Sequence, residues 1–362
     1  MSAENYPENN VSPLPAAQAS VAGAPNALLL VLVPVLITAG LLLYKGRTSL
    51  IAIHKVRSAG TLSTKAGVVT LGGAGGFLSA VTHAAHYLLV IWPALAFGVL
   101  IGAAFQAFVP RDYLSRFLSA GTLRAQLAAG AAGAPLMLCS CCVAPVFSAV
   151  YEKTARLGPS LAVMLASPSL NPAALILTAA LFTPRIAVAR VLMALVAVGL
   201  GGVLIERLFA GETLARLRGD PVQPQPVPAG WRQSTLALLG SLRYILRTLP
   251  MLVLGALLSA AAAQYVPHGL LSSSSWSVIS IALTAAIAVP LALPTFFEIP
   301  LAVGLLAAGA PAGVAVALLF AGPAVNLPSL LNLARDTHWK VAAALAAIVW
   351  VIAVVGGLAV NA

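Results

Sequence analysis

Long apolar runs fill most of this chain, and short polar stretches separate them. Each run approaches or exceeds the roughly 20 apolar residues that a helix needs to cross a bilayer. Backbone groups have no water to bond with in lipid, and the runs are continuous rather than alternating in polarity, so we expect helices and not β-strands. The predicted fold is all-α, a polytopic bundle with spans near 26–44, 85–109, 126–150, 158–182, 184–206, 243–266, 276–298, 300–334 (one long or two short elements) and 341–360.

Composition supports a membrane protein and argues against a soluble one. Apolar residues make up 60% of the chain and charged residues 8%, whereas soluble domains carry about 25% charged residues. The net charge of +11 is spread along the loops, as the positive-inside bias predicts, and is no nucleic-acid footprint. We therefore expect a multi-pass protein of an inner or plasma membrane whose partner is the lipid bilayer, with no nucleic acid and with a homo-oligomer left open.

Two clusters of basic residues set the expected orientation. One follows the first predicted span and the other follows the fifth, and an even number of spans separates them, so both can lie in the cytoplasm. The N-terminus would then lie outside. The clusters are Lys45, Arg47, Lys55, Arg57 and Lys65, and Arg207, Arg216, Arg218, Arg232, Arg243 and Arg247.

The predicted organisation has five parts. Residues 1–25 form a polar, disordered N-terminus, and 26–81 hold the first transmembrane helix and a basic cytoplasmic loop. A first repeat spans 82–208, a Pro-rich cytoplasmic linker spans 209–241, and a second repeat spans 242–362. The repeat appears when Pro145 is aligned with Pro300, because Pro, Gly and Asn positions then coincide.

Both predicted repeats contain proline-rich interruptions at matching positions, which are 135–145 with 168–172 and 290–300 with 323–328. Interrupted spans at matching positions of two halves indicate a transporter's binding site near the midplane. The pattern leaves open whether the repeats are parallel or inverted.

All three cysteines of the chain lie within four positions, in Pro135-Leu-Met-Leu-Cys139-Ser140-Cys141-Cys142-Val-Ala-Pro145. Thiolates select soft metals and metalloids, and a disulfide scaffold is disfavoured by the odd number and the near-adjacent spacing. We therefore predict that Cys139, Ser140, Cys141 and Cys142 bind substrate, with the three thiols as metal or metalloid ligands. The competing interpretation is that small Cys and Ser residues only allow close helix packing.

Three further residues complete the predicted site. Asn171 and Asn326 each stand beside helix-breaking prolines, where an amide can bind substrate or cap a broken helix. Glu298 is an acidic residue deep in an apolar run. A carboxylate inside a membrane is costly and is a functional hypothesis by default, here proton coupling, unless it lies at the membrane edge.

The cysteine segment together with Ser167-Pro168-Ser-Leu-Asn171-Pro172 resembles the predicted-permease family that includes the ArsP-type efflux permeases. That family has a proline-flanked Cys-Ser-Cys-Gly motif, a small-Pro-x-x-Asn-Pro motif, and a Gly-Pro-Ala-x-Asn-Leu element, seen here from Gly322 to Leu327. The resemblance covers roughly residues 82–360. Cys142 stands where the family has Gly, and Phe297-Glu298 stands where smaller or thiol side chains are expected.

The resemblance implies a bacterial inner-membrane permease that exports trivalent organoarsenicals, with Cys139 and Cys141 as thiol ligands. No nucleotide-binding motif is present, so we expect an ion gradient to drive export, with neither enzymatic activity nor a resident cofactor. The alternatives are a Cu(I) or Zn(II) efflux transporter and a membrane thiol redox or assembly protein in which Cys141 and Cys142 change oxidation state.

Overall fold

The computed structural model describes residues 27–59, 77–109, 122–154, 156–209, 231–264, 277–293, 296–307 and 309–361. Every secondary-structure element within these ranges is a helix, which confirms the all-α prediction. The N-terminus predicted to be disordered and most of the predicted linker lie outside the described residues.

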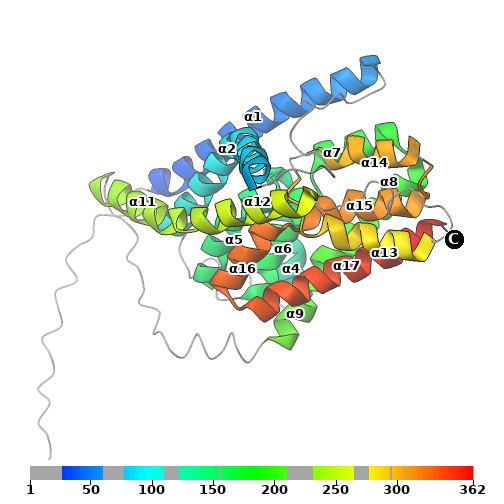
Figure 1. Cartoon of the computed structure of the whole chain (residues 1–362). Coiled ribbons are helices and arrows are strands. Elements are labelled where there is room, and N and C mark those ends of the chain that lie inside the picture. Colours follow the sequence, from blue (N-terminus) through cyan, green and yellow to red (C-terminus); the bar gives the residue numbers. More distant parts are fainter. Residues whose placement is uncertain are drawn as a thin grey trace, which may run out of the picture.

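Long and short helices pack together in one bundle (Figure 1). They are α1 Ala27–Ala59, α2 Phe77–Phe108, α4 Thr122–Gly133, η1 Ala134–Leu136, α5 Ser140–Thr154, α6 Leu157–Ser169, α7 Pro172–Leu181, α8 Pro184–Val196, the π-helical η2 Ala197–Gly201, α9 Gly202–Leu208, α11 Trp231–Leu246, α12 Leu249–Gln264, α13 Ser277–Ala288, α14 Glu298–Ala307, α15 Ala312–Ala324, α16 Leu327–Asp336 and α17 Trp339–Asn361.

Five helical stretches of the described chain are long and apolar enough to cross a membrane, and two bent helix pairs raise that number to seven if each pair is one span. The protein is therefore a multi-pass membrane protein. The five stretches are Val35–His54, Leu78–Phe108, Pro184–Leu208, Thr235–Ala261 and Trp339–Asn361.

Other predicted spans are each divided into two helices. The divisions lie near the prolines from which the interruptions were predicted. The run at 126–150 is divided between α4 and α5. Pro135 lies in the short helix η1 between them, and Met137, the residue after η1, has a left-handed conformation (φ 50°). A proline removes a helical hydrogen bond and blocks the preceding turn. Helix α6 likewise gives way to α7 with a bend of 41°, and α15 to α16 with a bend of 43°.

Short helices recur at a constant distance along the chain. Helices α4, α6 and α7 have counterparts in α13, α15 and α16, whose first and last residues are each 155 positions later. Helix α5 packs on α16, and its counterpart α14 packs on α7; these two contacts lie toward opposite ends of the bundle (Figure 1). Such exchanged contacts are what an approximate two-fold rotation between halves produces, while their homology stays a prediction.

Helix α1 differs from its prediction. The first span was expected to end at residue 44 and to be followed by a basic loop, but α1 continues to Ala59. Between these points the sequence has one glycine and no proline, so nothing ends the helix. Arg47 is exposed, whereas Lys45 is buried together with Leu41 and Ser49, four residues before and after it. Lys45 therefore lies inside the span, on its inner face.

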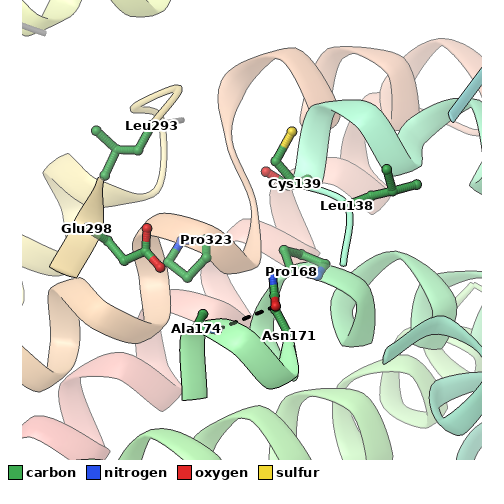
Figure 2. A pocket seen from close by; sticks show the side chains of 9 residues that line it. Leu138, Cys139, Pro168, Asn171, Ala174, Leu293, Glu298 and Pro323 are labelled. Carbon is green, nitrogen blue, oxygen red and sulfur yellow. Dashed lines mark hydrogen bonds between the residues drawn. The ribbon is translucent and has the colours of Figure 1, made fainter. Parts of the chain in front are cut away.

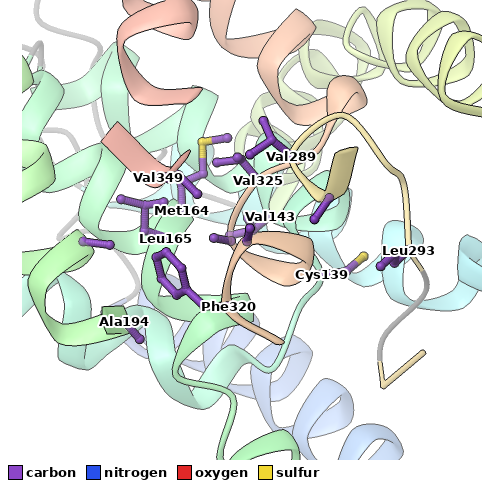
Figure 3. Close-up of a cluster of buried hydrophobic side chains, with 14 of the residues drawn as sticks. Cys139, Val143, Met164, Leu165, Ala194, Val289, Leu293, Phe320, Val325 and Val349 are labelled. Carbon is purple, nitrogen blue, oxygen red and sulfur yellow. The ribbon is translucent and has the colours of Figure 1, made fainter. Parts of the chain in front are cut away.

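The hydrophobic core is centred on α5, α6 and α15, which are buried on nearly all sides. Figure 3 shows side chains of these helices converging, among them Val143, Met164, Leu165 and Phe320. Helices buried all round lie in the interior of a membrane bundle rather than at its lipid face. The broken segments that these helices flank are thus shielded from lipid.

Glycines allow the helices to approach closely around the thiols. A Cβ atom on Gly98 of α2 would collide with the carbonyl oxygen of Cys142 in α5. On Gly133 of α4, a Cβ atom would lie 2.8 Å from the carbonyl oxygen of Val163 in α6. Small residues commonly permit such backbone contacts between membrane helices. The position of the cysteine segment therefore depends on Gly98.

Candidate functional site

A small cavity lies where the broken segments of both halves meet (Figure 2). Two of its lining residues, Leu138 and Pro168, have counterparts 155 positions later, Leu293 and Pro323, that line it as well. The space has room for about one water molecule, so a larger solute would require the walls to separate. The full lining is Leu138, Cys139, Ser140, Pro168, Asn171, Ala174, Leu293, Glu298 and Pro323.

Local backbone structure places the first thiol at the cavity. Cys139 precedes α5, and its carbonyl oxygen accepts hydrogen bonds from the backbone N–H groups of Cys142 and Val143, 3.0 Å each. The backbone N–H of Leu138 donates to Ser167 Oγ of α6 at 3.0 Å. Hydrogen bonds therefore hold both Leu138 and Cys139, which lie between η1 and α5.

The three sulfurs form one cluster. Cys139 Sγ lies 2.8 Å from Cys142 Sγ and 3.1 Å from Cys141 Sγ, and the Sγ atoms of Cys141 and Cys142 are 3.8 Å apart. Sulfurs that share an ion at about 2.3 Å each can be at most about 4.6 Å apart. All three cysteines are free, and they are the one group of three or more metal-type ligands found among the described residues.

The cysteines differ in access to the cavity. Cys139 lines the cavity and is 6% exposed, and its side chain faces Leu293 across it (Figure 3). Cys141 and Cys142 are more deeply buried and do not line it. The hydroxyl of Tyr87 from α2 lies 3.1 Å from Cys141 Sγ. A solute in the cavity would therefore meet Cys139 first, with the other two sulfurs behind it.

The two predicted asparagines have similar local structure and different access. Asn171 Oδ1 accepts from the backbone N–H groups of Ala173 and Ala174 at the start of α7, and Asn171 lines the cavity (Figure 2). Asn326 caps α16 through a reciprocal capping box with Ser329 and is not a lining residue. Both therefore cap broken helices, and the structure brings Asn171 alone to the cavity.

Glu298 lines the cavity from the first turn of α14 and is buried inside the bundle. Its Oε1 accepts a hydrogen bond from Arg190 Nη2 of α8 at 3.0 Å. Arg190 Nη1 also donates to Thr178 Oγ1 of α7 at 2.5 Å. The carboxylate is thus part of a buried ion pair that joins α8, α7 and α14.

Arg190 is a site residue that the sequence reasoning missed. The signal was present, because Arg190 is a charged residue inside the predicted span 184–206. A fully buried guanidinium in a membrane span requires a partner, and Glu298 was the carboxylate already placed in a span. The contact of Tyr87 with Cys141 could not be predicted in this way, because an aromatic residue in an apolar run usually belongs to the hydrophobic core.

One end of the α5–α16 contact carries further polar groups. Ser148 of α5 donates a hydrogen bond to Asp336 at the end of α16, and Arg335 pairs with the same carboxylate at 2.7 Å. Gln106 of α2 donates to Glu152, one turn further along α5. The residues 155 positions from Ser148 and Asp336 are Val303 and Leu181, which are apolar. The polar groups of the α5–α16 contact therefore have no polar counterparts at the equivalent positions of α14 and α7.

Most of the chain matches known proteins. The ArsP_1 family model, described as a predicted permease, matches residues 77–362. The UPF0718 protein YraQ of Escherichia coli (strain K12) is 32% identical over 288 residues, which are 78% of this chain and 81% of that protein. The UPF0718 protein MJ0584 of Methanocaldococcus jannaschii is 30% identical over 84 residues, 23% of each chain.

No solved structure matches this chain. The family match begins at the start of α2, so the thiol cluster, Arg190 and Glu298 lie within it, and α1 with its buried lysine precedes it. Together with its membrane-spanning helices, this match shows that the chain belongs to the ArsP_1 family of predicted permeases.

Proposed function

We propose that this permease exports a soft, thiol-reactive solute from a bacterial cell across the inner membrane, and that this solute is a trivalent organoarsenical such as methylarsenite. The observation that carries the proposal is the position of Cys139 at the cavity, with two further sulfurs in contact with its own. Soft thiolate ligands bind this class of solute in preference to hard cations.

The binding step is a ligand exchange without a redox change. Methylarsenite carries two hydroxyl groups on arsenic, and two cysteine thiols replace them, forming two As–S bonds and releasing two water molecules. Cys139 is the first thiol that the solute meets, and Cys141 or Cys142 supplies the second sulfur. Exchange with water reverses the step, so the solute can leave at the other side.

Passage requires the cavity to open alternately to the two sides. In this proposal, separation of α5 from α16 opens one end and separation of α7 from α14 opens the other; both pairs are in contact in this structure. In transporters built from two such halves, rocking of one part against the other around a fixed site gives alternating access. The broken segments are the places where such a movement needs no intact helix to bend.

The ion pair of Arg190 and Glu298 is the proposed coupling element. A proton arriving at Glu298 from the cavity removes the charge that holds Arg190, and the links of α14 to α8 and α7 then weaken. Loss of the proton restores them. Proton antiport through Glu298 thus uses a buried group with two discrete arrangements.

The experiment is accumulation in a bacterium that lacks its own arsenical and copper exporters. Cells that express the protein should exclude methylarsenite relative to cells with an empty vector, and collapse of the proton gradient should remove the difference. Arsenite, Cu(I) and Zn(II) are measured in the same cells. Equal methylarsenite accumulation with and without the protein would contradict the proposal, and exclusion of Cu(I) or Zn(II) alone would replace it with a metal exporter.

A further inference from the structure

The hydroxyl group of Tyr87 contacts the thiol cluster from a neighbouring helix. It lies 3.1 Å from Cys141 Sγ, and the tyrosine side chain is buried in α2. Within the described part of the chain, Cys141 is the one hydrogen-bond partner of this hydroxyl. A buried tyrosine hydroxyl usually has such a partner, and the ligand exchange proposed above gives this contact no role.

The packing of α2 on α5 holds this contact in place. Tyr87 lies on the same buried face of α2 as Ala94 and Gly98, which follow it at helical spacing. At Gly98 the two backbones are so close that a Cβ atom would collide with the carbonyl oxygen of Cys142. The tyrosine ring therefore has little freedom to move away from Cys141.

The two inner thiols differ in what surrounds their sulfur atoms. Cys141 Sγ is in contact with the Tyr87 hydroxyl as well as with sulfur, whereas the hydrogen-bond partners of Cys142 Sγ in the described chain are the other two sulfurs. Both sulfurs lie close to Cys139 Sγ, at 3.1 Å for Cys141 and 2.8 Å for Cys142. Distance alone therefore does not select one of them as the second ligand.

Binding to arsenic changes the hydrogen bonds that a sulfur can make. A free thiol can donate its own S–H, but a sulfur that has formed an As–S bond has lost that hydrogen and can only accept. Cys141 would then accept from the Tyr87 hydroxyl, whereas Cys142 has no O–H or N–H donor to its sulfur among the described residues. Hydrogen bonds to ligand atoms from groups behind them orient and stabilise the ligands.

We propose that Tyr87 is a positioning residue that makes Cys141, rather than Cys142, the second ligand of a solute bound at Cys139. This inference rests on the proposed thiol site and names the two thiols that the site uses. With phenylarsine oxide, the thiols of Cys139 and Cys141 form two As–S bonds, and their hydrogens leave with the arsenic-bound oxygen as one water molecule. The oxidation states of arsenic and sulfur do not change, and Cys142 remains a thiol.

Binding of phenylarsine oxide to the purified full-length protein in detergent tests this assignment without transport. The protein is equilibrated with the reagent and graded concentrations of a small competing dithiol, and its intact mass gives the fraction that carries the phenylarsenic group. The chain has three cysteines, all in the cluster, so no other thiol can form the adduct.

The variants separate the hydroxyl from the sulfur on which it acts. They are Tyr87→Phe, which keeps the ring, and Cys141→Ser and Cys142→Ser, each with and without Tyr87→Phe. Tyr44→Phe, on an exposed tyrosine of α1, is the control. Melting temperatures of the empty proteins establish that each variant is folded.

We expect Tyr87→Phe to weaken binding by roughly tenfold, both in the wild type and in Cys142→Ser, because the bound sulfur of Cys141 loses its donor. Cys142→Ser alone and Tyr44→Phe should bind as the wild type does, while Cys141→Ser should bind roughly tenfold more weakly. Addition of Tyr87→Phe to Cys141→Ser should have no further effect, which a general loss of packing would not produce.

An equal effect of Tyr87→Phe with and without Cys141 would overturn the inference, because the tyrosine would then act through the fold alone. Wild-type affinity in Tyr87→Phe or in Cys141→Ser would overturn it as well, and so would loss of binding in Cys142→Ser. Absence of any adduct on the folded wild-type protein would instead overturn the proposed function.

Discussion

Arg190 and Glu298 are 108 residues apart in sequence and form a buried ion pair at 3.0 Å beside the thiol cavity. The pair connects α8, which follows the broken span of the first half, to α14, which follows the break of the second. Glu298 lines the cavity and Arg190 stands behind it. The carboxylate of Glu298 is therefore accessible to a solute or a proton in the cavity.

The first prediction concerns the stability of this pair. Arg190→Met and Glu298→Gln each leave one buried partner unmatched and should each lower the free energy of unfolding by about 3–5 kcal/mol. The double variant should lose much less than the sum, because neither charge remains. Thermal and denaturant unfolding in detergent measures all three. Additive losses would mean that the two residues do not act as a pair.

The second prediction concerns coupling. Glu298→Gln keeps the shape of the side chain but cannot release a proton, so export driven by a pH gradient should slow by roughly tenfold. Counterflow exchange of the solute, which needs no gradient, should continue. Both rates are measured in vesicles that contain equal amounts of folded protein. Gradient-driven export at the wild-type rate would argue against Glu298 as the coupling residue.

The third prediction concerns the packing of α2 on the thiol segment. Gly98→Ala places a methyl group against the carbonyl oxygen of Cys142 and should cost about 1–3 kcal/mol by overpacking. Gly240→Ala is the matched control, since nothing lies within 4 Å of a Cβ atom there, and it should be neutral or slightly stabilising in an exposed helix. Melting temperatures compare the two variants. Equal effects would contradict the close approach of α2 and α5.

The fourth prediction separates the two asparagines. Asn326→Ala should cost about 1 kcal/mol through loss of the cap of α16 and should leave solute binding unchanged once the protein is folded. Asn171→Ser retains a capping hydroxyl and should preserve stability, while it alters affinity because Asn171 lines the cavity. Binding of phenylarsine oxide at matched folded fractions distinguishes them. The assignment fails if Asn326→Ala changes affinity as much as Asn171→Ser does.

Much of the fold follows from local features of the sequence. Apolar runs predicted the membrane helices, and prolines such as Pro135, Pro168 and Pro323 predicted the breaks, because both effects act within one helical turn. The predicted end of α1 was wrong. Its basic residues suggested a loop after residue 44, but no residue there ends the helix. Charge bias indicates which side a segment lies on but not where its helix stops.

The site was less predictable because it depends on contacts between distant segments. Sequence placed Cys139, Asn171 and Glu298 at helix breaks, and the structure brings all three to one cavity. The sequence could not predict that Arg190 pairs with Glu298 or that Lys45 lies on the inner face of α1. Both depend on how α8 and α1 pack against segments that are distant in the sequence. Asn326 occupies the position equivalent to Asn171 but does not line the cavity, so equivalent positions in the sequence did not predict equivalent access.

The most direct measurement is uptake of methylarsenite into inside-out membrane vesicles under an imposed pH gradient, for the wild type, Cys139→Ser and the variant with all three cysteines replaced by serine. The account predicts uptake by the wild type, loss of most of it in Cys139→Ser, and none above empty vesicles in the triple variant, with all proteins folded. Methylarsenite uptake by the triple variant at the wild-type rate would contradict the claim that sulfur at the cavity carries the solute.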